Sequence, residues 1–231
     1  KNEGSYLGVL WYLLNPLLTF LLLAAIFFPR LGQKIPHYSL YLLLGIVLFN
    51  LFQQITTEAI KTIRQNNRLI KSVTFPCESL VVAVLWKALF AHLWEIILFI
   101  AIALFSGMSI SGILFYPLIL IFFCLFCLGA ALLLSCVTVY FLDLENIWAF
   151  AVRLIWFGTP IFYAIGGQDR LFLINLFNPV YYFMTIARDV VIYSRPPQLW
   201  MAGGAACYAI LFFIIGRETF SRLKVKFAEM I

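Results

Sequence analysis

Six long apolar runs, each close to the length that crosses a bilayer, constrain this chain more than any other feature. A transmembrane helix needs about 20 apolar residues to cross the hydrocarbon core. The runs cover residues 7–28, 39–57, 80–105, 113–142, 147–165 and 199–215. They are continuous rather than alternating, which favours helices over the strands of a barrel. The sequence therefore predicts an all-α integral membrane protein with six transmembrane helices, forming a single domain over residues 1–231.

The amino-acid composition supports a membrane protein and excludes other classes. Hydrophobic residues make up 64% of the chain and charged residues 11%, whereas a soluble domain carries about 25% charged residues. A chain so poor in charge could not cover its own surface in water, which excludes a soluble globular fold. The net charge of +6 is typical of basic loops on the cytoplasmic side of a membrane, and it does not predict nucleic-acid binding.

Lysine and arginine residues are concentrated in two segments outside the apolar runs. With six spans, the loop after the second run and the C-terminal tail lie on the same side of the membrane, together with the N-terminus. These two segments hold eight basic residues: Lys61, Arg64, Arg68, Lys71, Arg217, Arg222, Lys224 and Lys226. The opposite side has five: Arg30, Lys34, Arg170, Arg188 and Arg195. Because basic residues are enriched on the cytoplasmic side, both termini are predicted to be cytoplasmic.

The sequence contains no P-loop and one Cys-x-x-Cys pair. Without the pattern G-x-x-x-x-G-K-[ST], the chain is not expected to bind and hydrolyse a nucleotide by that motif. Cys124 and Cys127 have a spacing found in metal and redox sites. They lie in ILIFFCLFCLGAALLL, with no histidine or acid nearby, so we interpret them as small apolar residues. No catalytic residue and no metal site is predicted.

Aromatic and polar residues recur at helical spacing on three of the predicted spans. Steps of three and four residues place them on one face of each helix. A sugar ring suits such a face, because its C–H surface stacks on aromatic rings while its hydroxyl groups need polar partners. The alternative is packing inside the bundle, together with aromatic belts at the membrane surface. The candidate channel residues are Tyr12, Asn15, Tyr41, Phe49, Phe52, Trp148, Arg153, Trp156 and Tyr163.

Ionisable residues inside the predicted spans are further candidates, because charge is costly in a membrane and usually marks function. Glu95 and His92 lie one helical turn apart near the middle of the third span. They could form a proton relay, or Glu95 could pair with His92, Arg153 or Lys87 to hold helices together. One histidine and one acid are few groups for a proton relay, so a structural pair is the favoured interpretation.

The segment 66–78, NNRLIKSVTFPCE, separates the second and third spans and mixes basic with apolar residues. A loop that only fixes the topology needs its charges but not its apolar side chains. Apolar side chains on a cytoplasmic loop favour a docking surface for another protein. The candidate contact residues are Asn67, Arg68, Leu69, Ile70, Lys71, Phe75 and Glu78. Pro76 and Glu78 suit the start of the next helix.

The connection between the last two spans is too long and too apolar for an ordinary loop. Residues 166–198 contain apolar clusters that are each too short to span a membrane. Asn178 before Pro179 is a capping and starting signal for a helix. We therefore expect two short helices within residues 170–193, dipping into or lying along the outer interface. The candidate residues of this outer gate are Asn178, Pro179, Tyr181 and Tyr182.

Three motifs in this order resemble a known family. They are Gly8-Val9-Leu10-Trp11-x-x-x-Asn15-Pro16 in the first span, Asn67-Arg68-Leu69-Ile70-Lys71 with Phe75-Pro76 after the second, and Asn178-Pro179 between the last two. Each motif is short, and the order and spacing over most of the chain carry the resemblance. The chain is similar to the membrane subunit of type-2 ABC exporters that move polysaccharides such as O antigen, capsule or teichoic acid.

The resemblance implies a permease in a bacterial inner membrane that works as a homodimer with two copies of a separate P-loop ATPase subunit. ATP and magnesium would be bound by that partner, and no cofactor is expected in this chain. Segment 66–78 would be the coupling helix, with a second, smaller contact at Asp143-Leu144-Glu145. The helices within 170–193 would be re-entrant gate helices. The expected cargo is a lipid-linked polysaccharide, with O antigen favoured.

Three other functions remain open, one of which is a membrane scaffold that transports nothing. An exporter of drugs or small lipids has the same layout but needs no aromatic residues along its whole path. A proton- or ion-coupled transporter would use His92, Glu95 and Arg153. The family usually has an amphipathic interfacial helix ahead of the first span, whereas only KNEGSY precedes it here. We therefore expect residues upstream of Lys1 in the complete protein.

Overall fold

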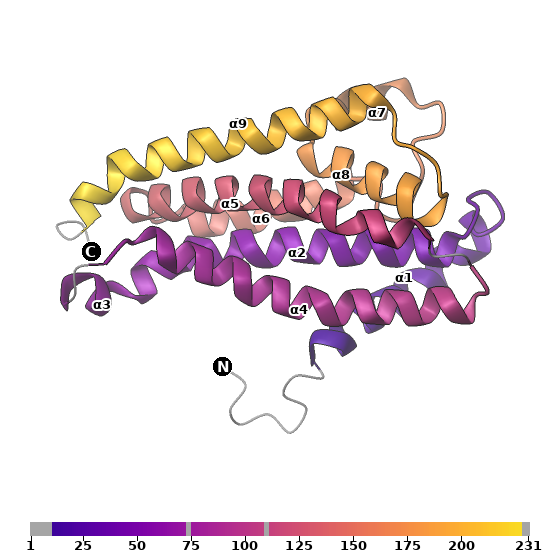
Figure 1. The fold of residues 1–231 in the computed structure, drawn as a ribbon, viewed down its shortest axis with the longest axis horizontal. Coiled ribbons are helices and arrows are strands. Elements are labelled where there is room, and N and C mark those ends of the chain that lie inside the picture. Colours follow the sequence, from indigo (N-terminus) through magenta and orange to yellow (C-terminus); the bar gives the residue numbers. More distant parts are fainter. Residues whose placement is uncertain (1–10, 73–74, 109–110, 228–231) are drawn as a thin grey trace.

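The computed structural model describes residues 11–72, 75–108 and 111–227, and all regular secondary structure in these residues is helical. The long helices run side by side along the longest axis of the molecule (Figure 1). In chain order the elements are α1 (Trp11–Leu31), α2 (Tyr38–Gln65), α3 (Asn67–Ser72), α4 (Glu78–Phe105), η2 (Ser111–Phe115), α5 (Tyr116–Tyr140), α6 (Leu144–Gly158), α7 (Asp169–Leu176), α8 (Pro179–Ala187), η3 (Arg188–Ile192), α9 (Leu199–Leu223) and η4 (Lys224–Lys226).

Five helices in the described part of the chain are long and apolar enough to cross a membrane. They are Leu13–Leu31 of α1, all of α2, all of α4, the combined η2–α5 unit Ser111–Tyr140, and α9. Because every backbone polar group of a helix is satisfied within the helix, such segments are stable in lipid. The prediction of a multi-pass, all-helical membrane protein is confirmed. Residues 7–10 of the first predicted span lie outside the described residues.

The fifth predicted span, residues 147–165, is not confirmed as a membrane-spanning helix. The helix found there, α6, has 15 residues and ends at Gly158, short of the roughly 20 that cross the hydrocarbon core. Thr159 has an extended backbone, with φ −80° and ψ 136°, because a residue before proline is disfavoured in the helical region. After Pro160 the chain continues without regular helix to residue 168.

Helix α2 lies at the centre of the bundle. It contacts α1, α4, α5, α6, α8 and η3. Of its most apolar window, 78% is buried, compared with 11% for α1. Helix α6 is as poorly covered as α1, with Val152 its one buried residue among the 15 described. One wall of the protomer, formed by α1 and α6, therefore lacks the cover that the core helices have.

Helices α5 and α9 approach each other more closely than ordinary side chains allow. Gly129 of α5 lies against the backbone of Phe212 on α9, and Gly216 of α9 lies against the backbone of Gly129. A Cβ atom at either glycine would overlap backbone atoms of the other helix. Small residues are typical of membrane helix interfaces for this reason, since they let two backbones pack closely.

One end of the bundle gathers α3, the start of α4 and the end of α9 (Figure 1). Two ion pairs join elements at this end. Lys61 Nζ of α2 lies 2.8 Å from Glu145 Oε1 of α6, and Lys224 Nζ of η4 lies 2.6 Å from Glu78 Oε1 of α4. This is the end with the two basic segments identified in the sequence, and its cytoplasmic orientation stays a prediction.

The proposed coupling segment contains one short helix, α3, and the proposed gate segment contains a pair of short helices, α7 and α8. Helix α3 has six residues, none of them buried, and Val73 and Thr74 of the predicted segment 66–78 lie outside the described residues. At the opposite end, α7 and α8 meet at Asn178-Pro179. Asn178 Oδ1 accepts a hydrogen bond of 3.1 Å from the backbone N–H of Val180, so the predicted helix cap is confirmed. The roles of these helices in coupling and gating stay predictions.

Candidate functional site

A polar cavity of about 660 Å³ lies between α1, α2, α4 and α6. It is an unusual feature in a bundle of apolar helices, because polar groups facing lipid would be costly. Four helices supply its lining: Trp11, Asn15, Pro16 and Thr19 of α1; Asn50, Gln53, Gln54, Thr57 and Glu58 of α2; Glu95 of α4; and Val152, Arg153, Trp156 and Phe157 of α6. Two tryptophan rings beside amides and hydroxyls make the lining amphipathic.

The cavity brings together three of the residues predicted to line a channel, namely Asn15, Arg153 and Trp156. The side chain of a fourth, Tyr12, lies outside the described part of the structure. Arg153 is exposed and has no carboxylate partner among the described residues. It therefore remains available to a group inside the cavity.

The other predicted channel residues lie elsewhere. Phe49 and Phe52 are buried in the core, where their rings pack on Trp156 and Trp148 respectively. The helical period was predicted correctly, but these two rings are buried by described residues and are not among those that line the polar cavity. An aromatic stripe suits a packed core as well as a channel. In this structure Phe49 and Phe52 lie in the core.

A polar stripe on the neighbouring face of α2 was not predicted from the sequence. Asn50, Gln53, Gln54, Thr57 and Glu58 recur at three- and four-residue steps. This spacing places them on one face of the helix. Amide and carboxylate side chains in a membrane-spanning helix point to a protein interior or a water-filled space. The stripe was therefore a stronger signal for a cavity than the aromatic residues beside it.

A chain of polar contacts leads from the cavity into the bundle. Asn50 Nδ2 donates to Glu95 Oε1 at 3.5 Å, and Glu95 Oε2 lies 3.4 Å from His92 Nδ1. His92 Nε2 lies 2.7 Å from the hydroxyl of Tyr116 on α5. His92 and Tyr116 are almost fully buried. Glu95 and His92 both lie on α4, and the 3.4 Å contact between them lacks hydrogen-bond geometry, so it is not an ion pair between helices. Lys87 of α4 pairs instead with Glu58 of α2 at 3.3 Å.

At the other end of the bundle, a buried arginine holds the segment after α6 in place. The Arg188 guanidinium of η3 donates to the carbonyl oxygens of Pro160 at 2.7 Å, Ile161 at 2.9 Å and Tyr41 at 3.1 Å. It also lies 3.4 Å from the centroid of the Tyr41 ring. A Cβ atom at Gly45, one turn along α2, would collide with the guanidinium. One side chain therefore joins η3, α2 and the segment that follows α6.

Other side chains donate to further oxygens in and next to this irregular segment. Asn175 Nδ2 and the Tyr163 hydroxyl donate to the carbonyl of Gly158, at 3.1 Å and 2.8 Å. Tyr38 donates to the carbonyl of Phe162 at 2.8 Å, and Asn178 Nδ2 donates to Thr159 Oγ1 at 2.7 Å. Non-helical backbone is tolerated in a membrane only where protein or water satisfies it. The predicted channel residues Tyr41 and Tyr163 therefore act here as structural ties.

The predicted gate residues fall in the same region. Pro179 begins α8, and Tyr181 and Tyr182 are buried on it. The Tyr182 hydroxyl donates to the carbonyl of Leu176 at 2.9 Å, which ties α8 back to α7. Arg188, Asn175 and Thr159 were not identified as site residues, because their roles depend on contacts between segments far apart in the sequence.

The predicted coupling residues form a partly exposed surface, in which Asn67, Ile70, Phe75 and Glu78 are half-buried. Arg68, Leu69 and Lys71 of α3 are exposed. Ile70 is partly buried against the core. The Glu78 carboxylate forms an ion pair with Lys224. Next to it, burial and the neighbouring Glu78 carboxylate raise the pKa of the Cys77 thiol, which keeps this thiol protonated at neutral pH.

In the part of the chain that the structure describes, no group of three His, Cys, Asp or Glu side chains could hold a metal ion. Cys124 and Cys127 are free thiols, and Cys127 is buried in the core.

The chain belongs to the ABC-2 type transporter family, which matches residues 3–192. It is therefore a membrane transport subunit, and the ATPase activity of such a transporter resides in a separate subunit. Three curated relatives are each called O-antigen export system permease protein RfbA. Two from Klebsiella pneumoniae are 26% and 27% identical to this chain, and one from Myxococcus xanthus is 24% identical. Each comparison extends over 239 residues, covering 100% of this chain and 90% of the relative.

Proposed function

We propose that this chain is the channel-forming permease of an ATP-driven polysaccharide exporter in a bacterial inner membrane. The observation that carries the proposal is the polar cavity along α2, lined by amides, hydroxyls and two tryptophans. Rings with a polar edge and an apolar face suit a sugar chain. The names of the three curated relatives support O antigen as the cargo, linked to a lipid at one end.

The proposed channel is formed by two copies of the chain. Helices α1 and α6 are poorly covered in the protomer, and α6 presents Phe150 and Leu154 beside Arg153, all exposed. A charged residue halfway along such a helix is costly against lipid. A second copy facing this wall would enclose Arg153 in a water-filled path lined by α1, α2 and α6. The channel lining proposed from the structure is therefore the polar face of α2, and no longer its aromatic face.

The proposed energy input is at α3, where a separate ATPase subunit would bind. Movement of that subunit would displace α3, and with it α2 and α4, and would widen the path between the two copies. At the opposite end, α7 and α8 would form the outer gate. This chain itself would bind no ATP or magnesium and carry out no covalent chemistry.

The series of polar contacts from Asn50 through Glu95 and His92 to Tyr116 does not favour the alternative of proton-coupled transport. A relay needs access to water at both ends, whereas this one begins at the cavity and ends at Tyr116, which is buried inside the bundle. The contacts are better suited to holding α2, α4 and α5 together.

The deciding experiment for the proposed function is reconstitution. The chain and the P-loop ATPase subunit encoded with it are expected to co-purify and to export polysaccharide only with ATP. If the chain binds no such subunit, or if polysaccharide export proceeds without ATP, the proposed function is wrong. Export of small lipids or drugs in place of polysaccharide would support the alternative exporter.

Changing the polar stripe of α2 should reduce export without unfolding the protein. The double substitution Gln53→Leu and Gln54→Leu removes two polar partners from the cavity. We expect polysaccharide export to fall at least about tenfold, since each lost polar contact in a site costs about 1 kcal/mol or more. The measurement is surface polysaccharide in cells, at equal amounts of membrane protein. Matched controls are Gln33→Leu and Gln168→Leu, both at exposed positions outside the cavity, and export equally reduced in the controls contradicts the proposal.

Changing the exposed surface of α3 should separate the two subunits. Arg68→Ala with Leu69→Ala removes a charge and an apolar side chain that no described residue buries. We expect loss of co-purification with the ATPase subunit and of ATP-dependent export, while the thermal stability of the isolated permease stays unchanged. The matched control is Arg222→Ala with Val225→Ala, an exposed basic and apolar pair at the same end of the bundle. Normal binding by the α3 variant would show that α3 is not the contact.

A further inference from the structure

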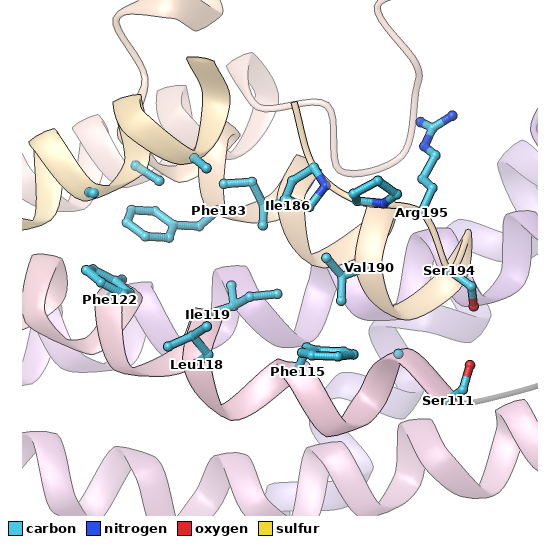
Figure 2. Close-up of a pocket in the computed structure, with 16 residues that line it drawn as sticks. Ser111, Phe115, Leu118, Ile119, Phe122, Phe183, Ile186, Val190, Ser194 and Arg195 are labelled. Atoms are coloured by element: carbon cyan, nitrogen blue, oxygen red, sulfur yellow. The ribbon is translucent and has the colours of Figure 1, made fainter. Parts of the chain in front are cut away.

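An apolar groove of about 630 Å³ lies between the beginning of α5, the α8–η3 unit and the beginning of α9. It is separate from the polar cavity and shares no lining residue with it. Figure 2 shows Phe115, Leu118, Ile119 and Phe122 along one side, facing Phe183, Ile186 and Val190 on the other. The side of α9 contributes only small residues, Ala202, Ala205 and Ala206. The three alanines leave the space open where larger side chains would close it.

The groove is continuous with the surface that faces the membrane lipid. Phe115 is 63% exposed and Leu118 58% exposed on one side of the groove. Beyond its edges, Leu114 and Ile121 of the η2–α5 unit and Leu199 of α9 are also exposed. These are large apolar side chains on helices that cross the membrane. The neighbour that this surface meets is therefore the hydrocarbon of the bilayer.

The groove has the depth of an acyl chain and a polar rim. Its η2–α5 side extends from residue 111 to residue 122, which at about 2.0 Å per residue in η2 and 1.5 Å in α5 is about 18 Å and somewhat more than half of the hydrocarbon thickness. Its rim is formed by Ser111, Ser194 and Arg195. The Arg195 guanidinium points away from the apolar floor (Figure 2). Nε and Nη2 donate to Asp189 Oδ1 at 2.9 Å and 2.6 Å, while its side chain remains 64% exposed.

We propose that this groove binds one acyl chain of a membrane glycerophospholipid whose phosphate group lies at Arg195. An apolar space that opens to the bilayer fills with hydrocarbon rather than water, because water there would have almost no polar partner. Arg195 suits a phosphate because a guanidinium has five N–H donors and Asp189 takes only two of them, so that Nη1 and the second hydrogen of Nη2 can donate to phosphate oxygens. The bound chain packs on Phe183, Ile186 and Val190 and so completes the packing of the α8–η3 unit. This inference depends only on the membrane setting, and it holds whatever the transported cargo is.

The deciding experiment fills the groove. Ala206→Trp places an indole ring in the space between α9 and α8. The full-length wild-type chain and this variant are purified in detergent and incubated with phosphatidylglycerol bearing palmitoyl and oleoyl chains. Bound lipids are then counted by native mass spectrometry. We expect the wild type to retain one lipid per chain and the variant to retain at least about fivefold less. Ala83→Trp, at an exposed position of α4 outside the groove, should leave retention unchanged.

Each other outcome overturns the proposal. Equal retention by wild type and Ala206→Trp places the lipid elsewhere. Retention of a polyprenyl phosphate in place of the phospholipid makes the groove a carrier site, and a change of oligomeric state in Ala206→Trp alone makes it a contact between copies. If Ala206→Trp does not fold, Ala202→Leu replaces it with the same expected loss.

A second pair of variants tests the phosphate position. Arg195→Ala should lower retention about threefold or more, and Arg195→Lys should restore most of it because the positive charge is kept. Added phosphatidylglycerol should raise the melting temperature of the wild type and not that of Ala206→Trp. Unchanged retention in Arg195→Ala would place the phosphate elsewhere.

Discussion

Replacing Arg188 with Gln is expected to unfold the α7–α8 end of the bundle and to abolish export. The guanidinium donates to the carbonyls of Tyr41, Pro160 and Ile161, and a glutamine amide cannot reach all three. Each buried carbonyl left without a donor costs about 1–3 kcal/mol. Pro160 and Ile161 lie in a segment without helical hydrogen bonds. Among the described residues, the Tyr41 hydroxyl also donates to the Pro160 carbonyl at 3.2 Å, so Ile161 is the carbonyl that depends most on Arg188.

The measurement is thermal unfolding of the purified protein in detergent, with export in cells as a second readout. Arg188→Lys should give an intermediate melting temperature, since a compact ammonium bonds fewer of the carbonyls than a planar guanidinium. Arg170→Gln is the matched control, because Arg170 is an exposed arginine on α7 in the same region. A melting temperature of Arg188→Gln within a degree of the control would show that the arginine does not hold the segment.

Replacing Gly216 with Ala is expected to destabilise the α5–α9 interface with the addition of one methyl group. The new Cβ would overlap the carbonyl of Gly129, so one helix has to move away from the other along an extensive contact. Overpacking of a well-packed interior costs about 1–3 kcal/mol, and more where backbone is the obstacle. We expect a clear fall in melting temperature and in the yield of monodisperse protein.

Gly203 provides the matched control on the same helix. A Cβ atom there meets nothing within contact distance, so Gly203→Ala should be neutral or stabilising by up to about 1 kcal/mol through helix propensity. The same fall in melting temperature in both variants would assign the effect to the loss of glycine itself and not to the α5–α9 contact.

The membrane fold was predictable from the sequence, and the length of α6 was not. Hydropathy identifies spans well because a membrane helix must satisfy its backbone internally. Hydropathy alone does not indicate the backbone conformation of an apolar run. Residues 159–165 continue the apolar run of α6, yet Pro160 ends the helix and the apolar side chains pack as an irregular segment. Proline after threonine was the available warning, and the apolar run outweighed it.

The candidate site was only partly predictable, for a different reason. The Asn178 cap is local, and a local pattern identified it. The placement of Phe49 depends on which side of α2 faces the core, and its aromatic ring suits a core and a channel equally well. The role of Arg188 depends on carbonyls at positions 41, 160 and 161, and no pattern within one segment announces a contact of that kind.

The unbroken course of α2 has a mechanical consequence. One helix of 28 residues, about 42 Å long at 1.5 Å per residue, begins beside Arg188 and ends one residue before α3. A tilt of about 5° imposed at its α3 end displaces Tyr41 near the far end, about 36 Å away at 1.5 Å per residue, by about 3 Å. Tyr41 and Gly45 sit at that far end and contact the Arg188 side chain. A displacement of about 3 Å is as long as a hydrogen bond itself, so a small tilt of a single rigid helix is sufficient to break the contacts between Tyr41 of α2 and the Arg188 side chain.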